Sequence, residues 1–147
     1  MARIIFDLPD RFAFSTEVQI YISHVNQGGH LDNAQLLSLV SEARLRFFQS
    51  IDFPSPALPD VSIVVGDIVA QYKSEGFHGE VMRIDMTPAD FNRYGFDLVF
   101  HVTEKTTGRE VARGKTGIAF VSKTSRSVVP IPEQVRARLL DLASLPA

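Results

Sequence analysis

The side chains best suited to chemistry in this sequence gather in one short polar segment. Ser23 to Gly29 carries an imidazole, two amides and a Gly-Gly pair, and His30 and Asp32 follow directly. The glycine pair gives the backbone unusual freedom, so we expect a loop here. An imidazole is the side chain that ordinarily gains or loses a proton near neutral pH. This loop therefore holds the main candidate functional residues.

The histidines of the chain do not suggest a metal site. His24 and His30 belong to the polar loop, whereas His78 is expected in a turn and His101 on the polar side of a strand. No two of them have the His-x-x-x-His spacing of a zinc-binding helix. The sequence has no cysteine, which excludes a disulfide, a thiolate metal site and a cysteine nucleophile. We expect no metal.

A long helix is predicted directly after the loop, from about Asn33 to Gln49, because apolar residues recur there at helical spacing. Asp32 suits the N-cap position, and Gln35 completes a capping-box-like pair with it. Glu42 and Arg46 are four residues apart and are expected to pair on an exposed strip. The apolar positions are Leu36, Leu37, Leu39, Val40, Ala43, Phe47 and Phe48. A helix with so wide an apolar face requires burial on most sides.

The remaining elements are predicted to be strands that position this helix. Residues 14–22 alternate, with Thr16, Val18, Ile20 and Ile22 on the side expected to be buried. Three prolines then follow the helix, and later segments again alternate or are rich in β-branched residues. These later strands are expected at 61–73, 80–86, 94–103 and 110–122. A short C-terminal helix is indicated by Val135, Leu139 and Leu142.

The order of one strand, one apolar helix and four more strands predicts an α+β fold in which the helix packs on an antiparallel sheet. Five strands could also close into a barrel around the helix. The chain has 147 residues, with 45% hydrophobic and 22% charged residues, which is typical of a globular domain and not of a disordered segment. We therefore expect a single domain over residues 1–147.

Charge and the N-terminal sequence bear on partners and location. The formal net charge is -2, so no positive field would recruit nucleic acid. An acid and a proline interrupt the N-terminal segment where a signal peptide needs an apolar run, and no run approaches the length of a membrane span. We expect a cytoplasmic protein without nucleic-acid or membrane partners.

The junction of loop and helix resembles a known family. Gly29 to Ala34 reads Gly-His-Leu-Asp-Asn-Ala, and Glu42 to Arg44 reads Glu-Ala-Arg. These motifs, with the strand order and the ending Val129 to Pro132, resemble the hotdog thioesterases of the 4-hydroxybenzoyl-CoA thioesterase type. The resemblance spans roughly residues 14–133. It implies a hotdog fold, with one long helix wrapped by a five-stranded antiparallel sheet and a short C-terminal helix.

The resemblance also implies an activity. Members of this family hydrolyse acyl-CoA or acyl-carrier-protein thioesters without a cofactor, coenzyme A being part of the substrate. They assemble as homodimers or homotetramers with active sites between subunits. Their catalytic carboxylate usually stands four residues before the position of His30, and here that residue is Asn26. An amide is neither a base nor a nucleophile at neutral pH.

The oxyanion donor of the family is a backbone N–H in the first turn of the central helix, near Asn33 here, and it does not depend on side-chain identity. Three residues could replace the missing base: His30, Asp32 and Glu42. Each also has a structural explanation, respectively in packing the loop, in capping the helix and in pairing with arginine. We favour Asn26 and His30 acting together. His24, Gln27 and Gly29 are candidates to contact the substrate.

Two other functions remain open at this point. Loss of the carboxylate could leave a protein that binds acyl thioesters without cleaving them. A hotdog hydratase or dehydratase is a weaker alternative, because the loop of those enzymes has an Asp and a His five residues apart and a proline between them. Here Asn26 and His30 are four residues apart, and the loop contains no proline.

Overall fold

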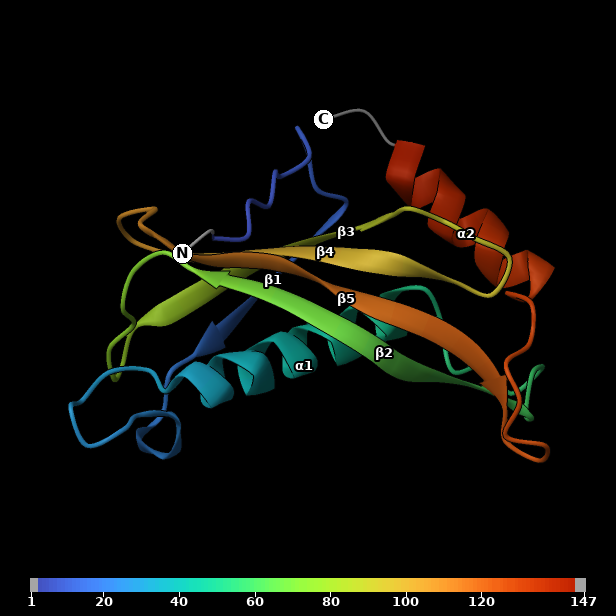
Figure 1. Ribbon diagram of the computed structural model, residues 1–147, viewed down its shortest axis with the longest axis horizontal. Coiled ribbons are helices and arrows are strands. Elements are labelled where there is room, and N and C mark those ends of the chain that lie inside the picture. Colours follow the sequence, from blue (N-terminus) through green and yellow to red (C-terminus); the bar gives the residue numbers. More distant parts are fainter. Residues whose placement is uncertain (1–2, 145–147) are drawn as a thin grey trace.

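The computed structural model describes residues 3–144 and consists of a curved antiparallel sheet wrapped around one long helix (Figure 1). The strands are β1 (Phe14–Gln19), β2 (Val61–Tyr72), β3 (Val81–Ala89), β4 (Gly95–Glu104) and β5 (Glu110–Ser122). The helices are α1 (Asn33–Ser50) and α2 (Glu133–Ser144), with a single 3-10 turn, η1 (Ile22–His24). This is the α+β arrangement that the order of elements predicts, and it is the hotdog fold that the family resemblance implies.

The order of strands across the sheet is β1-β3-β4-β5-β2, and every neighbouring pair is antiparallel. β1 and β2 therefore form its two edges. The two strands that flank α1 in sequence lie at opposite edges, so the sheet curves around the helix from both sides. This wrapping buries six residues of α1 against the inner face: Leu36, Leu39, Val40, Ala43, Phe47 and Phe48.

The inner face of the sheet supplies the other half of the core. Phe96, Leu98, Phe100 and Val102 of β4 alternate toward α1 and are fully or almost fully buried, as their spacing predicts. Glu104 continues the same series, although it is charged. Its carboxylate accepts hydrogen bonds from the backbone N–H groups of Thr106 and Thr107, and these bonds lower its pKa. The acid therefore fixes the hairpin between β4 and β5.

Strand β1 is shorter than the alternation predicts, and this is a correction to the expected range 14–22. Ile20 is still buried, but Ile22 is 73% exposed and not on the inner face. The Tyr21 N–H donates to Nδ1 of His24 at 2.9 Å, which turns the chain into η1. The side chain of His24 thus ends the strand early, and the alternation of apolar and polar residues does not predict this end.

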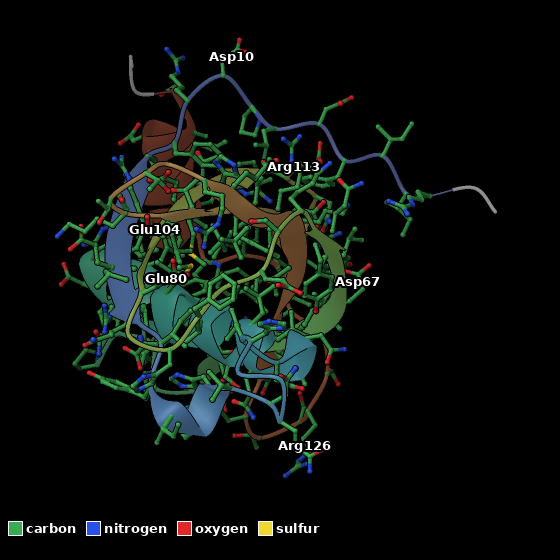
Figure 2. All side chains as sticks on the ribbon, turned by 90° about the vertical axis from the view of Figure 1, so that its left-hand side faces the viewer. Asp10, Asp67, Glu80, Glu104, Arg113 and Arg126 are labelled. Atoms are coloured by element: carbon green, nitrogen blue, oxygen red, sulfur yellow. The ribbon has the colours of Figure 1, made fainter. Side chains whose placement is uncertain are left out.

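The ends of the chain cover other parts of the molecule. Seen from the loop end, the N-terminal segment crosses the face of the sheet that points away from α1 and passes above Arg113 (Figure 2). A guanidinium N–H of Arg113 donates to the Phe6 carbonyl at 3.1 Å. α2 lies near the C-terminal end of α1 (Figure 1), with Val135 and Leu139 buried as predicted. The polar loop directly precedes the opposite, N-terminal end of α1.

Candidate active site

The polar loop between η1 and α1 is closed by its own backbone. Asn26 and His30 form two mutual contacts: the Asn26 N–H donates to the His30 carbonyl at 2.9 Å, and the His30 N–H reaches Oδ1 of Asn26 at 3.3 Å. The Gly29 N–H donates to the Asn26 carbonyl at 3.0 Å, and Gly29 has a φ of +80°. This backbone conformation favours glycine, which explains one member of the Gly-Gly pair.

The side-chain oxygen of Asn26 is occupied inside the loop. It accepts from the backbone N–H groups of Gly28 at 3.0 Å and His30 at 3.3 Å. Both partners are donors, which identifies the atom as the oxygen and leaves the NH2 group of the amide pointing elsewhere. Asn26 is exposed. It can therefore hold the loop and at the same time offer two N–H donors to a ligand or a water molecule.

The side chains of Asn26 and His30 both lie close to Gly28. A Cβ atom added at Gly28 would lie 3.4 Å from Oδ1 of Asn26 and 3.6 Å from Nδ1 of His30. The structure thus brings together the two residues that the sequence analysis favours. Both distances are ordinary van der Waals contacts, so the structure does not require glycine at position 28.

The imidazole of His30 is held by a residue that sequence spacing does not reveal. Nδ1 of His30 lies 3.3 Å from a carboxylate oxygen of Glu75, and the ring packs edge-on against Phe77 with centroids 5.3 Å apart. A carboxylate at Nδ1 favours the tautomer with a proton on that nitrogen. Nε2 then carries the lone pair and can accept a proton.

Glu75 and Phe77 belong to the turn between β2 and β3, which is tied to the loop. The Leu31 N–H donates to the Gly76 carbonyl at 2.8 Å, and a Cβ added at Gly76 would lie 2.9 Å from Ile20 and 3.2 Å from Leu31. The close approach therefore requires glycine. These contacts join the turn to the loop directly before α1.

The start of α1 is fixed by Asp32. Its Oδ2 accepts from the Ala34 N–H at 2.9 Å and the Gln35 N–H at 3.3 Å, which confirms the predicted N-cap. The expected capping-box pair with Gln35 does not form: the Asp32 N–H donates instead to the His24 carbonyl at 2.9 Å. Because its carboxylate is used in capping, Asp32 is not a free base in this arrangement.

The cap can be tested by its effect on stability. We expect Asp32→Ala to lower the free energy of unfolding by about 1 kcal/mol, since two N–H groups lose their acceptor. Gln35→Ala is the matched control and should change the stability by only a few tenths of a kcal/mol. Urea denaturation of both variants measures the difference. A larger loss in Gln35→Ala than in Asp32→Ala would contradict the assigned cap.

Asn33 contributes backbone rather than side-chain groups to the site. Its carbonyl accepts from the Tyr72 hydroxyl at 2.7 Å, while its N–H has no acceptor among the contacts of residues 3–144. Burial and the nearby Asp32 raise the pKa of Tyr72, so this hydroxyl remains a donor at neutral pH. The free N–H at a helix start favours a ligand atom that carries negative charge.

Glu42, the third candidate base, lies elsewhere. Its carboxylate bonds to the Arg46 guanidinium at 2.8 Å, as predicted, and Arg46 also bonds to Thr16 and to the Glu17 carbonyl on β1. Glu42 lies nine positions after Asn33 in the helix, which is about 14 Å along the axis. The structure does not bring Glu42 to the Asn26 and His30 pair within one chain.

The candidate substrate-contacting residues have different surroundings. His24 is engaged structurally, because its Nδ1 accepts from Tyr21 and its carbonyl accepts from Asp32. Gln27 is exposed at the tip of the loop. Away from the loop, His101 pairs with Glu110 at 2.7 Å on the outer face of the sheet. No group of three or more potential metal ligands occurs within residues 3–144.

The family of the protein can be decided by comparison with known proteins. A model of the thioesterase-like superfamily matches residues 20–139, which include the loop, α1 and four of the strands. The chain belongs to the thioesterase-like superfamily. The resemblance of the loop and helix motifs is thereby confirmed at the level of the superfamily, and the 4-hydroxybenzoyl-CoA type remains a prediction. A sequence comparison with curated proteins found no significant match.

Several solved structures share the fold of this chain. A 1,4-dihydroxy-2-naphthoyl-CoA thioesterase from Synechocystis has a TM-score of 0.80 at 16% identity, covering 90% of this chain and 98% of its own. A Thermus thermophilus thioesterase complexed with coenzyme A and zinc has a TM-score of 0.80 at 22% identity, covering 95% and 100%. A Staphylococcus aureus protein in complex with CoA has a TM-score of 0.83 at 14% identity, covering 97% and 91%. At such identities the likeness shows the fold.

One further property concerns membranes. Neither helix within residues 3–144 of this thioesterase-like protein has the length and apolar character needed to cross a bilayer. A cytoplasmic location remains a prediction from the sequence.

Proposed function

We propose that this member of the thioesterase-like superfamily hydrolyses acyl thioesters of coenzyme A or of a carrier protein at the loop from His24 to Asn33. The observation that carries the proposal is the Asn33 N–H, which has no acceptor within residues 3–144 and starts α1 three residues after His30 of the closed loop. Thioester hydrolysis places negative charge on the carbonyl oxygen in the transition state, and a fixed N–H donor stabilises that charge. The reaction requires no cofactor or metal.

The proposed reaction begins with a water molecule between His30 and the thioester carbonyl. Nε2 of His30 takes a proton from the water as its oxygen bonds to the carbonyl carbon, and the Asn33 N–H donates to the resulting oxyanion. The carbon–sulfur bond then breaks, and the protonated imidazole returns its proton to the leaving thiolate. Glu75, 3.3 Å from Nδ1, stabilises the imidazolium in between.

Asn26 has a positioning role in this scheme. Its oxygen is bound by the Gly28 and His30 N–H groups, so its NH2 group is the part available to the substrate. An amide N–H can donate to the water oxygen or to the thioester carbonyl but cannot accept the proton of the water. Hydrolysis by the natural sequence should consequently be slow for this family.

A second function, binding of acyl thioesters without hydrolysis, is favoured because the carboxylates of Asp32 and Glu42 are already bound to other groups. Asp32 is bound to two backbone N–H groups of α1, and Glu42 is bound to Arg46. If His30 does not act as a base, the same loop would bind an acyl thioester without cleaving it. Release of free coenzyme A from a panel of acyl-CoAs tests the two functions. Slow turnover supports hydrolysis, whereas tight binding without release of coenzyme A supports the binding function.

We also propose that two copies of the chain pair through β2. This strand is twelve residues long, and within residues 3–144 β5 is the one strand that pairs with it, along one of its edges. Val64, Val65, Ile68 and Tyr72 of β2 are all more than 40% exposed. A long open edge with apolar side chains is a template for pairing with another strand. A second copy of the chain can pair with this open edge through its own β2, because two β2 strands pair antiparallel about a two-fold axis.

The pairing predicts a loss of assembly when a charge is placed on this edge. Ile68→Lys should convert the dimer, or a dimer-based tetramer, to monomers, because the lysines of the two copies approach each other near the axis. Light scattering coupled to gel filtration measures the change. Leu140→Lys replaces another exposed apolar residue, on α2, and should leave the assembly intact. A wild-type monomer at micromolar concentration would contradict the proposed pairing.

A further inference from the structure

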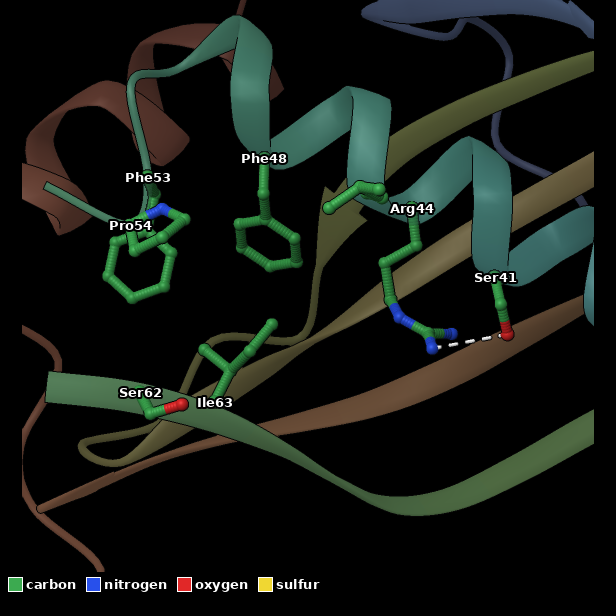
Figure 3. Close-up of a pocket in the computed structure, with 8 residues that line it drawn as sticks. Ser41, Arg44, Phe48, Phe53, Pro54, Ser62 and Ile63 are labelled. Atoms are coloured by element: carbon green, nitrogen blue, oxygen red, sulfur yellow. Dashed lines mark hydrogen bonds between the residues drawn. The ribbon is translucent and has the colours of Figure 1, made fainter. Parts of the chain in front are cut away.

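An open pocket lies between the second half of α1 and the first residues of β2, away from the loop of the same chain (Figure 3). Its volume is about 250 Å³, just below the range of about 300–1,000 Å³ that holds drug-sized ligands. The residues that define it are Ser41, Arg44, Phe48, Phe53, Pro54 and Ile63. A pocket of this size suits a short chain or a single ring.

The pocket has an apolar part and a charged part. The rings of Phe48 and Phe53 lie 5.7 Å apart at 54° and face Ile63 across the opening (Figure 3). Arg44 lies farther toward the start of α1, next to Ser41. The only hydrogen bond of its side chain within residues 3–144 is a long one, 3.3 Å, to the Ser41 hydroxyl. One ligand could therefore contact aromatic carbon and a guanidinium at the same time.

The charge of Arg44 lacks an acid within the described chain. Residues 3–144 provide no carboxylate within ion-pair distance of it, whereas Arg46, two residues on, pairs with Glu42 at 2.8 Å. Burial lowers the pKa of Arg44, and a guanidinium nevertheless keeps its proton at any physiological pH. A partly buried cation without a counter-charge is unfavourable. An anion bound in the pocket would relieve this cost, and a planar carboxylate fits the two-pronged geometry of arginine.

The proposed pairing of β2 places this pocket beside the candidate active site of the second copy. Pairing about the middle of β2 sets Tyr72 of one copy near Val61 and Ser62 of the other. The Tyr72 hydroxyl donates to the Asn33 carbonyl at 2.7 Å, so the start of α1 lies next to Tyr72. In the proposed pair, Tyr72 of one copy lies near Ser62 of the other copy, and Ser62 lines the pocket. A thioester at one Asn33 N–H could extend its acyl group into the pocket of the other copy.

We propose that this pocket receives the acyl group and that Arg44 binds a carboxylate on it, which makes the substrates coenzyme A thioesters of short or single-ring dicarboxylic acids. The inference rests on the proposed hydrolysis of acyl thioesters and on the proposed pairing of β2, and it names the substrate class. Phe48, Phe53 and Ile63 contact the carbon skeleton. Arg44 selects against neutral acyl groups, because a neutral group would fill the pocket and leave the guanidinium without an acceptor.

The test compares chain-matched substrates that differ only at the end of the acyl group. Succinyl-, glutaryl- and adipyl-CoA are each paired with butyryl-, pentanoyl- and hexanoyl-CoA, and kcat/KM is measured for every one. We expect at least one acidic substrate to exceed its neutral partner by about 10-fold or more, as a charge-assisted hydrogen bond allows. Arg44→Leu should abolish that preference by lowering the acidic value about 10- to 100-fold, while the neutral value changes less than about 3-fold.

Two controls separate this role from other effects of the arginine. Arg44→Lys keeps the charge but not the planar fork and should retain part of the preference. Lys105→Leu removes a positive charge near β1, where Lys105 pairs with Glu17 at 3.1 Å, and should leave the preference unchanged. If Arg44→Leu lowers both substrate classes equally or dissociates the assembly, Arg44 has a structural role and the inference is wrong.

Binding measurements keep the inference testable if no thioester is hydrolysed. Calorimetric titration of glutaryl-CoA and pentanoyl-CoA into wild-type protein and Arg44→Leu then decides. Tighter binding of glutaryl-CoA that disappears in the variant supports the pocket assignment, although the proposed hydrolysis would have failed. Equal affinities in the wild-type protein, or no binding of either compound, overturn the inference.

Discussion

Replacing Asn26 by aspartate is expected to raise kcat/KM for acyl-CoA hydrolysis by about 100-fold, the scale of a well-placed general base. In the structure, Oδ1 of Asn26 accepts from the Gly28 and His30 N–H groups. One carboxylate oxygen of Asn26→Asp would keep both bonds, and the other would replace the NH2 group. Because aspartate ordinarily titrates near about 3.9, that second oxygen would be ionised at neutral pH. It could then attack the thioester or activate water.

Asn92 provides a matched control for this change. Its Oδ1 likewise accepts from two backbone N–H groups shortly after it in the chain, those of Tyr94 and Gly95 at 2.8 and 3.0 Å, in a different loop. Asn92→Asp should therefore leave hydrolysis unchanged. No gain in Asn26→Asp, with the thermal stability unaltered, would mean that the loop is not the hydrolytic centre.

Removing the imidazole of His30 is expected to lower kcat by about 100-fold in the natural sequence. Water would lose its only proton acceptor in the proposed scheme, and the leaving thiolate would lose its donor. The fold should persist, because the side chain of His30 is 38% exposed and its partner Glu75 is 60% exposed. Steady-state release of coenzyme A by His30→Ala measures the effect.

The surrounding residues separate catalysis by His30 from a packing role. His78→Ala removes an exposed imidazole from the neighbouring turn and should retain full activity. Glu75→Gln should cause a smaller loss than His30→Ala, because it weakens only the orientation of the ring. In the Asn26→Asp background, where a carboxylate can act as the base, His30→Ala should cost much less. An equal cost in both backgrounds would assign His30 to the packing of the loop.

Most of the fold could be predicted because its helices and strands are indicated by local sequence features, chiefly the regular spacing of apolar residues. The spacing of apolar residues in α1 and β4 predicts which of their side chains are buried, and Asp32 predicts where the helix begins. The errors lie where one side chain overrides the pattern. His24 ends β1 early by accepting the Tyr21 N–H. The carbonyl of the same residue takes the Asp32 N–H that a capping box would have used.

The candidate site could be predicted in its location but not in its contacts. Asn26, His30 and Asn33 are close in sequence, so one loop with its glycine pair brings them together. Glu75 and Tyr72 reach His30 and Asn33 from the far end of β2, and no spacing in the sequence connects these pairs. Arg44 was visible only as part of the Glu-Ala-Arg motif. The absence of an acid beside it is a property of the three-dimensional structure.

The proposed site is tested most directly by a crystal structure with an acyl-CoA analogue in which a methylene group replaces the thioester sulfur. We expect its ketone oxygen to accept from the Asn33 N–H at about 2.7–3.1 Å, the distance expected of an oxyanion donor. The NH2 group of Asn26 and Nε2 of His30 should lie on the side from which water attacks. A ketone bound away from Asn33, with the His24 to Asn33 loop empty, would contradict the proposed site.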